Sequence, residues 1–254
     1  MDYYRGNALY DYISSTGTQR FKFVSGNMWQ LIYGDDKCNP KLLALVVGVD
    51  KFEPDSLPTE VEEPFLLLKS LGDKCGIPTK IICFDSSEPS VENVWVYEDA
   101  ESEAKEVSMA ELTDIFGSVG LPTSNSSTAK YLNDRTSSAY HKWQRASLGR
   151  SLTVSDIDLW KLDEDGNPHS IYELKRSFYG LDRWQPFRDD YRNFQLVSNL
   201  ANCSEVGFQI VYNVRHKNPF RDDVSKLKLF EVNFSLNPTI KYMGIVPKEG
   251  FIDV

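Results

Sequence analysis

Two acidic side chains and one lysine lie on either side of the turn sequence DEDGNP. Asp158 comes before the turn, and Glu173 and Lys175 come after it in "YELK". The dipeptide Asp165–Gly166 between alternating segments strongly favours a β-hairpin. A turn centred on these two residues places Asp158 directly opposite Glu173. Opposed Cβ atoms lie about 4.5–5.5 Å apart, and two carboxylates this close repel each other unless a cation lies beside them. The pattern therefore predicts a cation at this position.

The cation has two candidate identities. In the first, Lys175 supplies the charge and forms a structural charge cluster, together with Asp156, which the same register places opposite Lys175. In the second, Mg²⁺ or Mn²⁺ supplies it, because Mg²⁺ takes one or two carboxylates together with waters and phosphate oxygens. Lys175 then reaches the same site, where it lowers the pKa of an attacking water or neutralises charge on a phosphate. The geometry expected from the sequence leaves both identities open.

Several elements must hold these residues in place. The spacing of apolar residues predicts a helix before the hairpin and a helix and a strand after it, over 137–149, 187–203 and 206–215. Two more strands are expected near the end of the chain, over 226–234 and 239–246.

The preceding sequence predicts a second set of elements. Alternation over 20–34 indicates a hairpin, 59–76 a helix closed by Gly76, and 108–120 a helix whose Ser108 and Glu111 can form a capping box. Apolar strands lie between them, so the whole chain is expected to be mixed α/β. The polar stretch 121–134 either links an N-terminal α/β region (1–120) to a second domain (135–254) or is a long loop within one domain.

The residues "SDIDLW" and "YELKRS" around the predicted hairpin resemble the PD-(D/E)xK nuclease superfamily, over about residues 135–215. This resemblance implies a restriction-endonuclease-like core in the C-terminal half, which is an α+β mixed sheet, with an N-terminal α/β segment before it. It also implies that Asp158 and Glu173 bind Mg²⁺ or Mn²⁺ and that Lys175 is catalytic. Asp156 becomes an accessory acid, or an alternative first ligand if the turn is centred differently.

The chain departs from the family pattern in two places. Many members carry a glutamate on the helix before the aspartate strand, but helix 137–149 has no acidic residue. His141 or Gln144 is then the substitute, and Glu111 is the nearest acidic residue on a predicted helix. In addition, the family's first strand has little room before Asp158, so segment 20–34 is the expected donor of that strand.

A basic region surrounds the predicted site. Residues 175–230 contain ten Lys or Arg against six Asp or Glu, a net charge of +4, whereas the rest of the chain carries −13. Positive charge favours phosphate contacts. The residues expected to contact nucleic acid are Arg183, Trp184, Arg188, Arg192, Arg215 and Lys217. By resemblance to the family, Gln195 on the following helix is placed near the metal. The alternatives are that this helix face is simply solvated and that Trp184 covers the core.

Composition excludes other classes. The chain of 254 residues has a net charge of −9, four cysteines without metal-ligand spacing, and no apolar run long enough to span a membrane. A secretory signal is not visible, so a cytoplasmic location is expected. Neither a Gly-rich phosphate loop nor a Gly-x-Ser-x-Gly motif occurs.

The resemblance to this superfamily implies a metal-dependent nuclease, endo- or exonuclease, that hydrolyses phosphodiester bonds of DNA, and RNA is the other candidate substrate. Double-strand cutting by this fold commonly uses a homodimer, and phage biology and defence are among the pathways that such an enzyme serves. The alternative is a non-catalytic binding or inhibitor module whose acidic surface mimics nucleic acid. A third interpretation makes the N-terminal half a sensor whose output is the nuclease.

Overall fold

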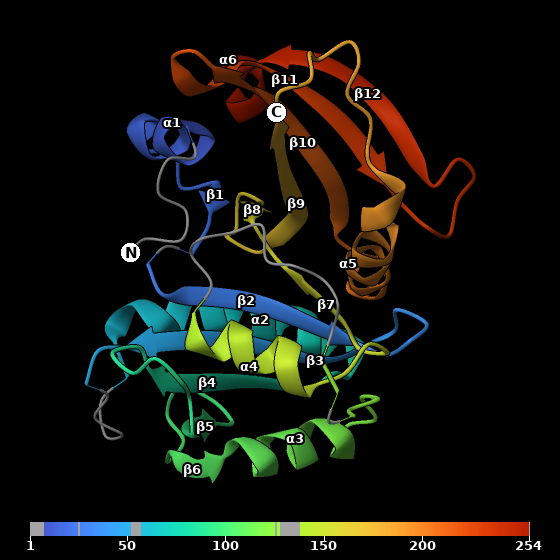
Figure 1. Ribbon diagram of the computed structural model, residues 1–254. Coiled ribbons are helices and arrows are strands. Elements are labelled where there is room, and N and C mark those ends of the chain that lie inside the picture. Colours follow the sequence, from blue (N-terminus) through green and yellow to red (C-terminus); the bar gives the residue numbers. More distant parts are fainter. Residues whose placement is uncertain (1–7, 25, 52–56, 125, 128–137, 254) are drawn as a thin grey trace. The chain divides into compact units, whose positions relative to one another are not determined.

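The computed structural model describes residues 8–24, 26–51, 57–124, 126–127 and 138–253 (Figure 1). The chain forms two compact units. The first unit is built from Val24–Asp156, and the second from Tyr4–Phe23 together with Ile157–Val254. The second unit is thus discontinuous in sequence, because the first unit is inserted between its two segments. Mixed α/β structure is confirmed for both units.

The first unit contains a six-stranded mixed sheet in the order β6-β5-β4-β3-β2-β7. Its strands are β2 (Met28–Gly34), β3 (Pro40–Val49), β4 (Thr79–Asp85), β5 (Asn93–Tyr97), β6 (Lys105–Ser108) and β7 (Thr153–Asp156). β3 and β4 run parallel, and the other neighbours in this sheet run antiparallel. The helices are α2 (Glu62–Cys75) after the short 3₁₀ helix η1 (Thr59–Val61), α3 (Met109–Ser118) and α4 (Ala139–Ser147).

Helices cover both faces of this sheet. Leu112 and Phe116 of α3 and Tyr140 of α4 belong to one core cluster with the sheet side chains Leu42, Ala44, Val46 and their neighbours on that face. On the other face α2 contacts β3 and β4.

The expected helix ends are confirmed. Gly76 adopts φ 64° after α2, and Ser108 with Glu111 forms a capping box at the start of α3.

The second unit contains a six-stranded sheet in the order β1-β8-β9-β10-β11-β12. Its strands are β1 (Phe21–Lys22), β8 (Leu159–Leu162), β9 (Pro168–Ser177), β10 (Gly207–Lys217), β11 (Phe220–Val232) and β12 (Ile240–Pro247). β9 and β10 are parallel and are joined through η2 (Arg188–Asp190) and α5 (Tyr191–Cys203). The other neighbouring strands are antiparallel. α1 (Ala8–Thr16) and α6 (Lys248–Asp253) contact β11, and α5 contacts β10.

Two expectations about the organisation of the chain differ from this structure. The hairpin predicted over 20–34 is wrong, because Phe21–Lys22 pairs with β8 whereas Met28–Gly34 pairs with β3 and β7 in the other sheet. Alternation in the sequence predicts one buried face for each segment, whereas nearly every residue of Met28–Gly34 is buried, and alternation does not reveal which strand is the neighbour. The expected division at 121–134 also does not coincide with the two units, since α4 and β7 lie in the first unit. Residues 125 and 128–137 lie outside the described residues.

Candidate functional site

The turn between β8 and β9 is closed by a side chain. The carboxylate of Asp163 accepts hydrogen bonds from the backbone N–H groups of Asp165, at 3.0 Å, and Asn167, at 2.8 Å. Gly166 adopts φ 83°, a conformation that glycine reaches without steric cost. These features explain why the sequence turns at this position.

The register of the hairpin is the one that places Asp158 beside Glu173. Leu159 pairs with Tyr172, and the same register holds through the next two pairs before a shift near the turn. Extending the register by one residue from Leu159 and Tyr172 brings Asp158 opposite Glu173. The sequence prediction for this pair of positions therefore agrees with the observed strand pairing.

Asp158 is fixed by two hydrogen bonds. Its Oδ2 accepts from the backbone N–H of Leu174 at 2.7 Å, which joins the side chain to β9 just before the start of β8. Its backbone oxygen accepts from the hydroxyl of Tyr10 in α1 at 2.9 Å. The carboxylate is therefore held at the end of the hairpin, next to the Glu173–Lys175 segment.

Lys175 lies between two carboxylates. Its Nζ is 2.8 Å from Oε1 of Glu173 and 3.8 Å from Oδ2 of Asp190, and it lies 5.6 Å from the centroid of the Phe194 ring. Glu173 and Lys175 are two residues apart on one strand and so share a face. This face points toward η2 and α5, which supply Asp190 and Phe194.

The charge state of Lys175 follows from these neighbours. Burial alone disfavours the charged ammonium, but the carboxylates of Glu173, Asp190 and Asp158 outweigh it, so the pKa of Lys175 is raised above its ordinary value of 10.5. Lys175 is therefore protonated at neutral pH. It can neutralise negative charge at this site, but it cannot act there as a general base.

Other acids and amides considered for this site lie in the first unit. Asp156 is in β7 and pairs with Leu31 of β2, so its expected position opposite Lys175 is wrong. The chain leaves the first sheet after β7 and enters the second at β8, which breaks the register extrapolated from the turn. Glu111 belongs to the capping box of α3, and Gln144 accepts a hydrogen bond from the Tyr33 hydroxyl in the core.

Asp190 forms an ion pair with Lys175 that the sequence pattern did not predict. Gln195 is half-buried on α5, but the two ion pairs of Lys175 are made with Glu173 and Asp190. The usable signal was the acidic pair Asp189–Asp190 directly before the helix that follows the Glu-x-Lys strand. Its proximity to Lys175 depends on the path of the intervening loop, which the sequence pattern does not specify.

Trp184 does not have the exposed position expected for a base-stacking residue. Only 3% of its surface is exposed, and its ring stacks on Tyr212 with centroids 4.0 Å apart. Its backbone oxygen accepts a hydrogen bond from Nζ of Lys228 at 2.7 Å. Trp184 therefore covers the core, which was the alternative interpretation, and its ring is not available to nucleic acid.

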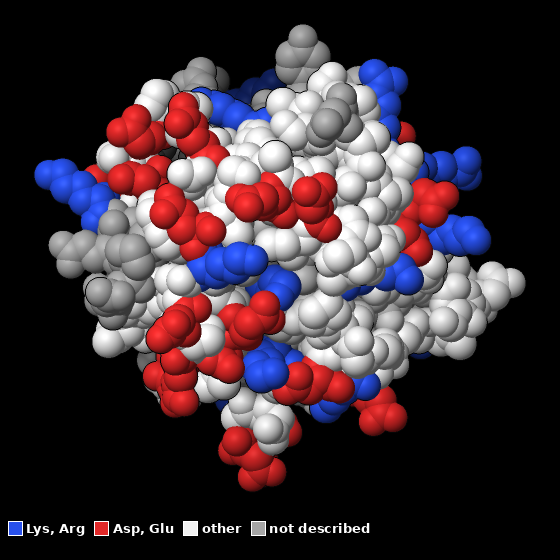
Figure 2. Space-filling model, turned by 90° about the horizontal axis from the view of Figure 1, so that it is seen from below, with Lys and Arg blue, Asp and Glu red and all other residues white. Residues whose placement is uncertain are grey.

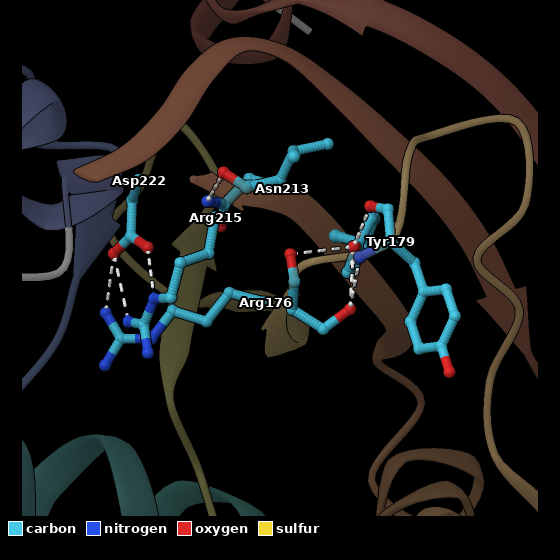
Figure 3. A network of polar contacts seen from close by, with 8 residues as sticks. Arg176, Tyr179, Asn213, Arg215 and Asp222 are labelled. Carbon is cyan, nitrogen blue, oxygen red and sulfur yellow. Dashed lines mark hydrogen bonds and ion pairs between the residues drawn. The ribbon is translucent and has the colours of Figure 1, made fainter. Parts of the chain in front are cut away.

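Arg215 is held within the protein by an ion-pair network (Figure 3). Its guanidinium makes two contacts to Asp222, at 2.7 and 3.3 Å, and Arg176 contacts the same carboxylate at 2.9 Å. The side chain of Asp222 is only 2% exposed. Because Arg215 is committed to this buried carboxylate, its role is structural in this arrangement. The other predicted basic contacts, Arg183, Arg188, Arg192 and Lys217, are exposed.

The donor set at Asp158 and Glu173 suits a hard cation. Within the described part of the chain, no three His, Cys, Asp or Glu side chains are grouped to hold a metal ion. Zn²⁺ sites normally need three or four such ligands, whereas Mg²⁺ uses one or two carboxylates and completes its shell with waters and substrate oxygens. Two carboxylates beside a protonated lysine are therefore oxygen donors of the kind that Mg²⁺ or Mn²⁺ takes.

Comparisons with known proteins do not assign a family. The sequence matches no protein-family model, and no curated protein matches it. Among the described residues, none of the helices has the length and apolar character needed to cross a membrane. The function must therefore be argued from the site itself.

Proposed function

We propose that this chain is a metal-dependent nuclease of the PD-(D/E)xK type that hydrolyses phosphodiester bonds of DNA. The observation that carries the proposal is the position of Asp158 directly before β8, with its carboxylate bonded to the backbone of Leu174 beside Glu173, and of Lys175 on the same face of β9 as Glu173. Two acids and a half-buried, charged lysine at the end of a hairpin match the chemistry that phosphodiester hydrolysis needs.

The order of elements in the second unit supports the proposal. The superfamily places a helix and a strand before the aspartate strand, and a helix and a strand after the Glu-x-Lys strand. Here α1 and β1 precede β8, and α5 and β10 follow β9, with β10 parallel to β9. The first strand comes from residues 21–22, within the segment expected to donate it. Many members carry a metal-binding glutamate on the helix before the aspartate strand. In this chain the corresponding helix would be α1, and its acidic residue is the exposed Asp11.

Four side chains have separate roles in the proposed reaction. Asp158 and Glu173 would hold Mg²⁺ or Mn²⁺, which supplies water activation and stabilisation of the leaving oxygen when bound. Lys175 places a fixed positive charge where negative charge develops on the phosphate. Asp190 holds the ammonium of Lys175 from the side of α5. Asp190 is therefore a positioning residue.

Cleavage of DNA tests the proposal. Plasmid and labelled oligonucleotides are incubated with the wild type and with Asp158→Ala, Lys175→Ala and Asp189→Asn variants in Mg²⁺ or Mn²⁺. Asp189 is an exposed acid next to Asp190, so Asp189→Asn is the matched control. The wild type and the control should cut, and the other two variants should lose activity by about 100-fold or more. A wild type that cuts neither substrate, or variants that cut as well as it does, would refute the proposal.

One observation favours the non-catalytic alternative. Val24–Asp156 contains 21 Asp or Glu against 12 Lys or Arg, whereas Tyr4–Phe23 with Ile157–Val254 contains 15 against 16. Residues 85–114 alone carry ten acidic side chains and one lysine. Figure 2 shows acidic side chains gathered on the face seen from below Figure 1. An acidic surface of this kind can occupy the nucleic-acid site of a partner protein. Calorimetry with Mn²⁺ discriminates, because an inhibitor without a working site gives no binding that depends on Asp158.

A further inference from the structure

We propose that the loop 178–187, which follows β9, is a stacking platform for single-stranded DNA. The platform consists of Phe178, Tyr179 and Phe187, together with the cations Arg183 and Lys217. This inference rests on the nuclease function proposed above and assigns the form of its substrate. Trp184 was the aromatic residue expected to stack on a base, but its ring is buried. The side chains proposed for this role are instead exposed to solvent.

The three aromatic side chains are unusually exposed. Phe178 is 51% exposed, Tyr179 57% and Phe187 48%. Tyr179 and Phe187 lie together, with ring centroids 6.4 Å apart and planes inclined by 63°. Large apolar side chains grouped on a surface mark a binding site more often than chance exposure does.

The backbone under these rings is fixed. The hydroxyl of Tyr212 donates to the backbone oxygen of Tyr179 at 2.5 Å and lies 2.8 Å from Oγ of Ser177. The same Tyr212 ring carries the stacked Trp184 in the middle of the loop. Figure 3 shows that the ring of Tyr179 projects away from the network that holds its backbone. The loop thus offers its rings without a large cost in ordering, which favours binding.

Both ends of the loop lie beside the candidate catalytic residues. Ser177, just before the loop, is two residues beyond Lys175 in β9. Just after the loop, η2 begins at Arg188 and brings Asp190 to 3.8 Å from Nζ of Lys175. A strand of nucleic acid that stacks on this loop is therefore positioned to pass the Lys175 ammonium.

One cation lies over a ring of the platform and another lies in the same loop. Nζ of Lys217 lies 4.8 Å from the centroid of the Phe178 ring. The side chain of Arg183 is 81% exposed, and its contact to Asp182 at 3.8 Å joins two groups that are both in water, where ion pairs are weak. Aromatic rings take bases and cations take phosphates, and this combination is the recognition surface of single-stranded nucleic acid.

The arrangement selects against a duplex. The flat faces of the bases are stacked on each other inside a double helix, so rings such as Tyr179 cannot reach them without unstacking the bases. Base stacking on an aromatic side chain contributes about 5- to 150-fold in affinity per ring and depends little on sequence. The platform should therefore bind a single strand regardless of its sequence and bind a duplex more weakly.

Binding measurements without divalent metal test the platform separately from catalysis. Fluorescence anisotropy of a labelled oligothymidylate is recorded in EDTA for the wild type, Tyr179→Ala, Phe187→Ala and Tyr179→Phe. Tyr242→Ala is the control, because Tyr242 is a 53% exposed aromatic residue on β12 of the same unit. The alanine variants should raise the Kd for the single strand at least about 5-fold. Tyr179→Phe, which keeps the ring, and the control should stay within a factor of about two of the wild type.

The possible outcomes separate this inference from the nuclease proposal. Unchanged Kd values in both alanine variants overturn the platform even if the wild type cleaves DNA. Equal losses for single-stranded and duplex DNA also overturn it, because the effect is then not stacking. Tighter binding of an oligouridylate than of the oligothymidylate overturns the choice of DNA. A selective loss of single-strand binding in a protein that cuts nothing supports the platform and refutes the nuclease.

Discussion

Replacing Asp158 with asparagine or with alanine separates its structural contact from its proposed metal contact. Oδ2 of Asp158 accepts a hydrogen bond from the N–H of Leu174 at 2.7 Å, so the side chain ties the start of β8 to β9. Asparagine keeps an oxygen that can accept this bond but removes the charge. Alanine removes the acceptor and leaves the N–H of Leu174 without it. Leaving a partly buried donor unsatisfied costs about 1–3 kcal/mol.

Urea denaturation and calorimetry together read out the two roles. Without metal, Asp158→Ala should lower the free energy of unfolding by about 1–3 kcal/mol, and Asp158→Asn by less than about 1 kcal/mol. In Mn²⁺ titrations both variants should lose the binding seen for the wild type, because a neutral amide is a poor ligand for a hard cation. Asp158→Asn that binds Mn²⁺ as tightly as the wild type would refute the metal role. Equal stability of Asp158→Ala and the wild type would refute the structural role.

Three further predictions concern the second unit. Asp222→Ala should lower the free energy of unfolding in urea by about 2–4 kcal/mol, because Arg176 and Arg215 lose a shared buried partner; a change below about 0.5 kcal/mol would contradict this. Trp184→Ala should cost about 3–5 kcal/mol in the same measurement, since it removes a buried ring, whereas a solvent-facing tryptophan would cost little. The pKa of Lys175 is raised in the folded state, so its contribution to stability is complete below its ordinary pKa of 10.5 and is lost as the pH rises through the folded pKa. The stability difference between wild type and Lys175→Met, measured across a pH series, should therefore be constant from about pH 7 to 9, and a difference that falls in this range would contradict the assignment.

The hairpin was predictable because its determinants are local. Asp165 and Gly166 lie in the turn, and from Lys161 and Ser170 onward the pairing follows the predicted register toward Asp158 and Glu173, although a register shift separates these pairs from the turn. Asp190 was not predictable in the same way. Its contact to Lys175 depends on how the loop 178–187 returns to the sheet, and this return is set by the burial of Trp184 against a strand that comes later in the chain.

The division into two units was hidden for a related reason. The sequence over 20–34 carries apolar residues at a period of two on both sides of its centre, yet Phe21–Lys22 and Met28–Gly34 belong to different sheets, and Met28–Gly34 is buried along nearly its whole length. Asp156 and Asp158 are likewise two residues apart, the spacing of residues on the same face of one strand. The chain nevertheless passes from one sheet to the other between them. Periodicity reports that one face of a strand is buried, and long-range pairing decides which sheet buries it.

Anomalous diffraction from a crystal soaked in Mn²⁺ tests the central claim most directly. The account predicts a manganese peak in contact with carboxylate oxygens of both Asp158 and Glu173, and the loss of that peak in Asp158→Asn crystals. Crystals of the wild type with no peak at this position, and with Lys175 still paired to Glu173 at high Mn²⁺ concentration, would contradict it.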